Sequence, residues 1–170
     1  MQKYIALLRA VNVGGTGKLP MIDLRKMCAD AGFKSIETYI ASGNVVFDSN
    51  AAPATVKAEL ESRLQAYSGK PVSVLIRTTT EMAAVLKANP FDATEPKHTN
   101  VIFLDERPQR DALKHAVGRV DEEMQLGRQE FYVAYPNGIG HSKLRIPAAK
   151  NGTARNLNTV AKLVQMASTT

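Results

Sequence analysis

Residues 37–49 read ETYIASGNVVFDS, two short runs rich in β-branched and aromatic residues that flank Ser42-Gly43-Asn44. Runs of this composition favour β-strands. Gly and Asn tolerate positive φ angles, which a tight hairpin turn requires. The stretch therefore predicts two antiparallel strands joined by a tight turn at residues 42–44.

Helical and strand patterns flank this hairpin on both sides. Upstream, KYIALLR (3–9) has the composition of a buried strand, and a helical pattern over 20–31 follows it. Downstream, a second helical pattern over 53–67 precedes the strand-like VSVLIR (72–77). Each helix begins at a proline and is followed by a glycine, which are typical start and stop signals. The order strand, helix, strand, strand, helix, strand predicts a ferredoxin-like unit.

The remainder of the chain repeats much of this order. We predict a connecting helix over 81–88, a strand at VIFLDE (101–106) and a helix over 108–117 that Pro108 opens. EMQLGRQEFYVAY (123–135) predicts a hairpin that turns at Gly127-Arg128, and a final helix begins near residue 157.

These patterns predict an α+β fold of two ferredoxin-like repeats packed into one compact unit with mostly antiparallel sheets. The first repeat covers residues 1–77, and the second, a modified repeat with a C-terminal helix, covers 78–170. No Ser/Gly/Pro-rich linker separates them. In this topology the third strand lies between the first two, so the loop 12–18 should lie near residues 42–44.

Composition indicates the compartment and the sign of the partner's charge. The 170 residues include 22 Lys and Arg against 16 Asp and Glu, a net charge of +6, which favours anionic partners. The single cysteine, Cys28, excludes an internal disulfide, and its helix-face spacing with Leu24 and Met27 predicts a packed thiol. The N-terminus lacks a signal-peptide pattern, and no apolar run reaches the ~18 residues that span a bilayer. We expect a cytoplasmic protein without a membrane partner.

The stretch VNVGGTGKLP (11–20) is a glycine-rich loop that precedes a helix. A phosphate-binding loop of the Walker type requires glycine at the position of Asn12 and a hydroxyl at the position of Leu19, so this loop lacks the magnesium ligand. The dinucleotide fingerprint fails because Pro20 replaces its third glycine. Exposed backbone N–H groups, Lys18 and the following helix still favour an anion. A loop that only turns the chain is the alternative.

A second candidate segment is YPNGIGHSKL (135–144), in which we interpret Ser142 as the N-cap of a short helix. Lys143 would then lie in the first turn, where the helix dipole disfavours it unless an anion is present. The three histidines have no metal-ligand spacing, so we expect no metal and no cofactor.

A third candidate is TARNLNTV (153–160), a dense polar set where an apolar helix starts. Thr153 or Asn156 could cap that helix, and capping alone is the alternative to ligand binding. Nucleic acid is not favoured as a partner, because ASGNVVF (41–47) offers one aromatic residue, Phe47, where RNA-binding sheets use several.

Four segments together resemble the bacterial family known as domain of unknown function 1697: ALLRAVNVGGTGKLPMIDLR (6–25), TYIASGNVVF (38–47), YPNGIGHSKL (135–144) and TARNLNTVAKL (153–163). The resemblance implies a cytoplasmic α+β protein of two ferredoxin-like repeats and brings no reaction with it. The sequence departs from the family pattern at Pro147, which would break the longer helix that usually follows the Ser-Lys-Leu stretch.

We therefore expect a binding protein whose loops 12–18, 42–44 and 142–159 assemble a site for an anionic small molecule or peptide group. The alternatives are an enzyme acting on a phosphorylated or carboxylated substrate, and a nucleic-acid-binding or protein-interaction module; the chain would be a monomer or a homodimer. No residue is assigned a catalytic role. The expected ligand-binding residues are Arg9, Asn12, Gly14, Gly15, Lys18, Ser42, Gly43, Asn44, Ser142, Lys143, Thr153, Arg155, Asn156 and Asn158.

Overall fold

A computed structural model describes residues 1–14 and 17–169 of the chain. It contains two compact units, one formed by Met1–Met82 with Leu163–Thr170 and the other by Ala83–Lys162. The boundaries between these units fall within α3 (Thr79–Lys87) and α4 (Leu157–Ser168). No helix in the described part of the chain has both the length and the apolar character that crossing a bilayer requires.

Unit 1 contains an antiparallel sheet in the order β2-β3-β1-β4. The strands are β1 (Gln2–Leu8), β2 (Lys34–Tyr39), β3 (Asn44–Ser49) and β4 (Val74–Thr78). This is the strand order of a ferredoxin-like fold. The predicted position of the third strand between the first two is confirmed.

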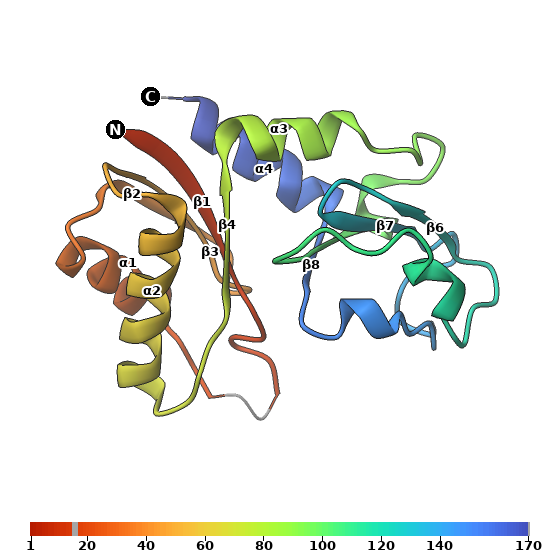
Figure 1. The fold of residues 1–170 in the computed structure, drawn as a ribbon, viewed down its shortest axis with the longest axis horizontal. Helices are drawn as coiled ribbons and strands as arrows, with labels where there is room; N and C mark the ends of the chain where they lie inside the picture. The colour runs from red at the N-terminus through yellow and green to blue at the C-terminus, as the bar shows by residue number, and fades with distance from the viewer. Residues whose placement is uncertain (15–16, 170) are drawn as a thin grey trace. The chain divides into compact units, whose positions relative to one another are not determined.

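Two α-helices, α1 (Met21–Asp30) and α2 (Pro53–Ser68), cover one face of this sheet (Figure 1). As predicted, each helix begins at or directly after a proline. Each is followed by a glycine with positive φ, at Gly32 (+86°) and Gly69 (+76°). Proline restricts φ to helical values at the first turn, and glycine adopts the left-handed conformation that ends a helix.

The core of unit 1 lies between the helices and the sheet. Tyr4, Ala6 and Leu8 alternate along β1 and enter this core, where Phe33 and Phe47 stack with ring centroids 4.3 Å apart. Ile5 and Leu7, on the opposite face of β1, are fully buried as well. Burial on both faces explains why KYIALLR is a continuous apolar run rather than an alternating one.

Unit 2 contains a second antiparallel sheet in the order β6-β7-β5-β8, which is the same order of strands along the chain. Its strands are β5 (Thr99–Phe103), β6 (Glu123–Leu126), β7 (Glu130–Ala134) and β8 (Thr153–Asn156). The 3-10 helices are η1 (Pro96–His98), η2 (Ala112–His115) and η3 (Pro147–Ala149). Unit 2 is thus a ferredoxin-like repeat in which η2 and η3 stand where unit 1 has α1 and α2.

Three local predictions are wrong. The helix expected over 108–117 is only the single 3-10 turn of η2, which shows that helix propensity and a proline start signal are weak predictors that tertiary context overrides. Residues 153–156, expected to lie at the start of the last helix, form β8 and pair with β5. The hairpin turns over Ile40–Gly43, with positive φ at Ile40 (+49°) and Gly43 (+91°), whereas Asn44 already belongs to β3.

Candidate functional site

The loop that leaves β1 meets the β2–β3 hairpin at one end of the unit 1 sheet. Leu8 N–H donates to the Gly43 carbonyl (2.9 Å), and Arg9 N–H donates to the Ser73 carbonyl (2.9 Å). Asn12 Nδ2 donates to the Ala41 carbonyl (2.7 Å). These contacts fix the chain after β1 between the hairpin and the segment that enters β4. The expected proximity of the glycine loop and the hairpin is confirmed at Asn12.

Gly43 permits this close approach. Its φ of +91° is unfavourable for other L-residues. A β-carbon at this position would lie 2.6 Å from Val11 Cγ2 and 2.9 Å from Leu8 Cβ. The glycine therefore has a packing role, because Val11 and Leu8 occupy the space that a side chain at this position would need.

Asn12 and Asn44 use their amide groups to hold the two loops. Asn12 Oδ1 accepts the Leu19 N–H (2.6 Å), and its Nδ2 also donates to the Leu19 carbonyl (2.9 Å), which closes the loop from residue 12 to residue 19. Asn44 is fully buried, and its Nδ2 donates to the Tyr39 carbonyl and to Ser42 Oγ, both at 2.9 Å. Both asparagines shape the loops, and their expected part in ligand binding remains a prediction.

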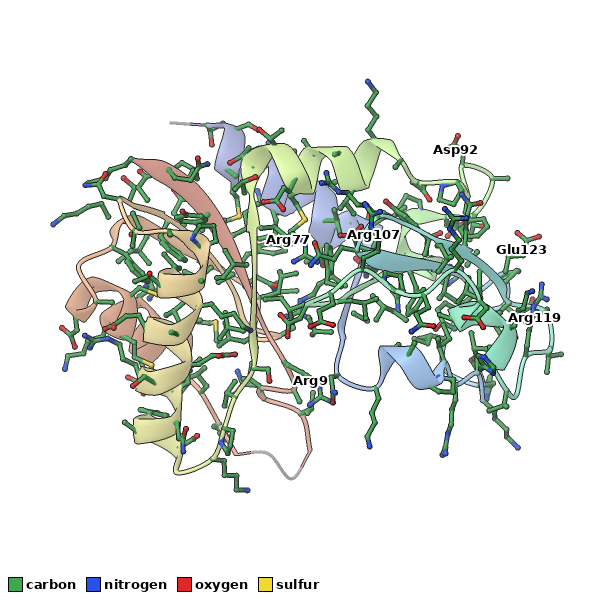
Figure 2. All side chains as sticks on the ribbon, viewed as in Figure 1. Arg9, Arg77, Asp92, Arg107, Arg119 and Glu123 are labelled. Carbon is green, nitrogen blue, oxygen red and sulfur yellow. The ribbon has the colours of Figure 1, made fainter. Side chains whose placement is uncertain are left out.

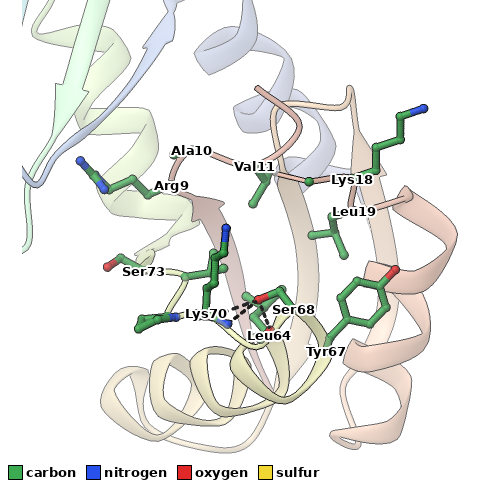
Figure 3. Close-up of a pocket in the computed structure, with 13 residues that line it drawn as sticks. Arg9, Ala10, Val11, Lys18, Leu19, Leu64, Tyr67, Ser68, Lys70 and Ser73 are labelled. Atoms are coloured by element: carbon green, nitrogen blue, oxygen red, sulfur yellow. Dashed lines mark hydrogen bonds between the residues drawn. The ribbon is translucent and has the colours of Figure 1, made fainter. Parts of the chain in front are cut away.

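A pocket of about 560 Å³ lies between this loop and the segment that joins α2 to β4 (Figure 3). Its inner surface includes Val11, Leu19 and Leu64, which are buried side chains of the core. Every charged side chain that lines it is cationic: Arg9, Lys18 and Lys70. Figure 2 shows Arg9 where the chain leaves β1. The remaining lining residues are Ala10, Gly17, Tyr67, Ser68, Pro71, Val72 and Ser73.

The three cations surround the pocket from different directions. In Figure 3, Lys70 extends toward Val11, whereas Arg9 and Lys18 extend outward on opposite sides. Within the described residues, neither the Lys18 nor the Lys70 ammonium group has a hydrogen-bond or ion-pair partner. The Tyr67 hydroxyl donates to Asp23 Oδ2 (2.7 Å), a bond that raises the pKa of Tyr67, so a carboxylate lies just beyond the lining.

Hydrogen bonds fix the wall formed by residues 68–74. Ser68 Oγ bonds to the carbonyls of Leu64 (2.9 Å) and Lys70 (3.0 Å) at the end of α2. At the start of β4, Val74 N–H donates to Glu61 Oε2 (3.0 Å) while Lys57 Nζ donates to the Val74 carbonyl (2.5 Å). The wall is therefore attached to α2 at both of its ends.

A second pocket, of about 570 Å³, lies on the other side of the glycine loop. It shares Gly17, Lys18 and Leu19 with the first pocket, and Asn12, Gly14 and Ala41 also line it. Pro20, the N-cap of α1, and Met21 complete this lining together with Val13. Lys18 is its one charged lining residue among those described. Gly15, another expected site residue, lies outside the described residues.

Three lining residues, Ser68, Lys70 and Ser73, are not among those expected from the sequence. In the sequence, the stretch that contains them indicates only a helix stop before a strand, since its glycine and proline dominate the local pattern. A lysine directly after a helix stop is only a weak indication of a binding site. The ferredoxin-like topology is a better indication, because β4 is adjacent to β1 and the segment entering β4 therefore meets the loop leaving β1.

In unit 2, Ser142 and Lys143 lie in a loop that packs against residues 117–122. Ser142 Oγ donates to Glu122 Oε2, and no helix begins at Ser142, so its expected N-cap role is wrong. Glu122 is buried and also accepts the N–H groups of Val120 (2.7 Å) and Asp121 (3.0 Å). The hydrogen bond from Ser142 and these backbone donors lower the pKa of Glu122 to about 2. Lys143 itself is exposed.

The other candidates of unit 2 belong to β8 and the start of α4. Arg155 is buried, its Nη1 donates to Thr153 Oγ1 (2.7 Å), and burial lowers its pKa to about 10, so it remains charged at neutral pH. Asn156 Oδ1 accepts the Thr159 N–H (2.9 Å), which is the capping role considered for it. Asn158 is exposed in the first turn of α4.

Two features bear on other chemistries. Cys28 is fully buried, and desolvation raises its pKa to about 12, so it is a packed thiol as predicted and not an activated nucleophile. Phe47 is fully buried beneath the helices, where it contacts Tyr4 and Phe33, so its ring cannot stack on a base.

The comparisons with known proteins agree with this fold. The model of a family described as "Protein of unknown function (DUF1697)" matches residues 1–132. The chain belongs to this family. The match includes the glycine loop, the hairpin and every lining residue of the two pockets beside the glycine loop, whereas the segments 135–144 and 153–163 lie beyond it.

Among solved structures, the chain is similar to the conserved bacterial protein SP0830 from Streptococcus pneumoniae. The two share 24% sequence identity with a TM-score of 0.81, and the alignment covers 98% of this chain and 99% of that chain. This similarity supports the two-repeat α+β fold. The search of curated proteins finds no match.

Proposed function

We propose that this protein binds an anionic small molecule in the unit 1 pocket between the loop leaving β1 and the α2–β4 connection. The observation that carries the proposal is the charge of the lining: Arg9, Lys18 and Lys70 line a space of about 560 Å³ that no described carboxylate lines. Clustered cations around a concave surface attract an anion and concentrate it locally.

The donors around the pocket suit an anionic group. Arginine and lysine form charge-assisted hydrogen bonds with carboxylate or phosphate oxygens, and these bonds are stronger than those between neutral groups. Ser73, whose hydroxyl lies on the same side of the pocket as Arg9 in Figure 3, adds a neutral donor. Lys18 is exposed, and exposed lysine side chains change rotamer on the nanosecond timescale, so Lys18 can turn toward a ligand without movement of the backbone.

The expected contribution of unit 2 remains a prediction. Ser142 and Asn156 already have hydrogen-bond partners within unit 2, which weakens the case for them as ligand donors. Lys143 and Asn158 are exposed and keep that capacity. The binding of an anion by unit 1 does not depend on any of them.

A thermal-shift screen of carboxylates and phosphate esters at constant ionic strength tests the proposal. A ligand at 100 times its Kd should stabilise the protein by about 2.7 kcal/mol. Lys70→Ala and Lys18→Ala should each weaken the best ligand about 3- to 10-fold, the size expected for losing one solvent-exposed charged contact.

The matched control is Lys34→Ala. Lys34 is an exposed lysine of the same unit that lies in β2, outside the lining of the pocket. It removes the same charge and should leave the stabilising shift unchanged. If no anion stabilises the protein, or if all three variants lose the same amount, the pocket is not an anion site.

A further inference from the structure

We infer that the ligand of this pocket is an amphipathic organic anion, with an apolar or aromatic body attached to its acidic group. The inference rests on the proposed function and specifies the class of ligand. Its evidence is the division of the lining into an apolar inner surface and a cationic rim.

The inner surface is apolar and belongs to the core of unit 1. Val11, Leu19 and Leu64 are all less than 8% exposed, yet their side chains line the pocket. Each of these three side chains keeps only a small area open to the pocket, and the more exposed Pro71 and Val72 provide most of the apolar surface, on the wall that enters β4. An inorganic ion would leave this surface in contact with water, whereas an apolar group would cover it.

Tyr67 gives the pocket an aromatic edge. Its ring stands beside Leu19 in Figure 3, and the residue is 48% exposed. The hydrogen bond from its hydroxyl to Asp23 restrains the ring in this position. A planar group placed against Tyr67 would bury ring surface that is now exposed, and offset aromatic pairs are favourable.

The size of the pocket agrees with such a ligand. About 560 Å³ lies within the range of roughly 300–1,000 Å³ that small organic ligands occupy. The second pocket fits this class less well, because Lys18 is its single charged lining residue among those described. An amphipathic anion would place its acidic group between Lys70, Arg9 and Lys18, with its body on Val11 and Leu64.

The test uses the full chain and three probes: 1-naphthalenesulfonate, inorganic sulfate and the neutral 1-naphthalenemethanol. Titrations are followed by NMR of backbone amides and of valine and leucine methyl groups. We expect naphthalenesulfonate to bind at least tenfold more tightly than sulfate and to shift the methyl signals of Val11, Leu19 and Leu64. Tyr67→Ala should weaken its binding at least threefold, whereas Tyr67→Phe, which keeps the ring, should not.

The outcomes separate this inference from the proposed function. If sulfate binds as tightly as naphthalenesulfonate and Tyr67→Ala has no effect, the ligand class is wrong while the anion site stands. If naphthalenemethanol binds as tightly as naphthalenesulfonate, or if Lys70→Ala leaves naphthalenesulfonate binding unchanged, the anion site itself is wrong. Methyl shifts confined to residues outside the pocket would overturn both.

Discussion

Replacing Gly43 with alanine should destabilise the protein through two separate costs. The φ of +91° costs an alanine about 1–2 kcal/mol. The new β-carbon would lie 2.6 Å from Val11 Cγ2 and 2.9 Å from Leu8 Cβ, an overlap that costs about 1–3 kcal/mol. Val11 can rotate, but Leu8 Cβ is fixed to β1. We expect a total loss of about 2–5 kcal/mol in the free energy of unfolding.

Gly32→Ala is the matched control for the backbone cost. Gly32 has nearly the same φ (+86°), and its β-carbon would meet no atom within 4 Å. Both variants gain equally from the lower entropy of alanine in the unfolded chain. The difference between them therefore measures the steric cost alone.

Urea denaturation followed by circular dichroism gives this difference directly. Gly43→Ala should be less stable than Gly32→Ala by about 1–3 kcal/mol, which corresponds to about 2–4 °C in Tm for each kcal/mol at this chain length. Equal losses for the two variants would refute the close packing of the hairpin on the loop that leaves β1. The pocket geometry, which depends on the position of that loop, would then be wrong as well.

Three further predictions concern the loops and the buried groups. Asn12→Ala removes three hydrogen bonds and should lower the free energy of unfolding by about 2–3 kcal/mol. It should also speed hydrogen exchange of the Leu19 amide, and an unchanged exchange rate there would contradict the closure of the loop by Asn12. The pKa of Glu122 is lowered in the folded state to about 2, so its contribution to stability is present above its ordinary pKa and is lost as pH falls through about 2. Wild type should therefore lose stability between pH 5 and pH 2 more steeply than Glu122→Gln, and parallel pH profiles would count against the buried carboxylate. Cys28 should react with a thiol reagent only as the protein unfolds, because burial raises its pKa to about 12, and rapid labelling of the native protein would contradict its packing.

The first repeat could be predicted from its sequence because local and global signals agree there. Pro53 and Gly69 determine the limits of α2, and the hairpin composition around Gly43 determines β2 and β3. Once these elements are known, the ferredoxin-like order follows from short connections and right-handed crossovers. The proximity of Asn12 to the hairpin is a consequence of that order.

The second repeat shows where local signals fail. Residues 153–156 are polar and include Asn156, which caps α4, so in the sequence they look like a helix start. They form a short strand because they pair with β5, a tertiary contact that the local sequence does not show. Pro108 is a valid helix start signal, yet the segment after it forms one 3-10 turn. Arg155 looked available to a ligand in the sequence, but the sheet buries it.

The candidate site could be predicted only in part for a related reason. Arg9 and Lys18 were found because they belong to a conspicuous glycine loop. Lys70 lies fifty-two residues after Lys18 in an ordinary helix-to-strand connection, and only the pairing of β1 with β4 brings its segment to the loop. The sequence also does not show which polar side chains already have hydrogen-bond partners within the protein. Asn12 and Asn44 are polar residues whose side-chain amides bond to backbone groups.

The most direct test of the anion pocket is a crystal structure of the protein with 6-bromonaphthalene-2-sulfonate, located by the anomalous signal of bromine. We expect the sulfonate oxygens about 3 Å from a nitrogen of Lys70, Arg9 or Lys18, and the brominated ring on Val11 and Leu64. A bromine peak on another surface of unit 1, with only solvent between the loop leaving β1 and the α2–β4 connection, would contradict the account.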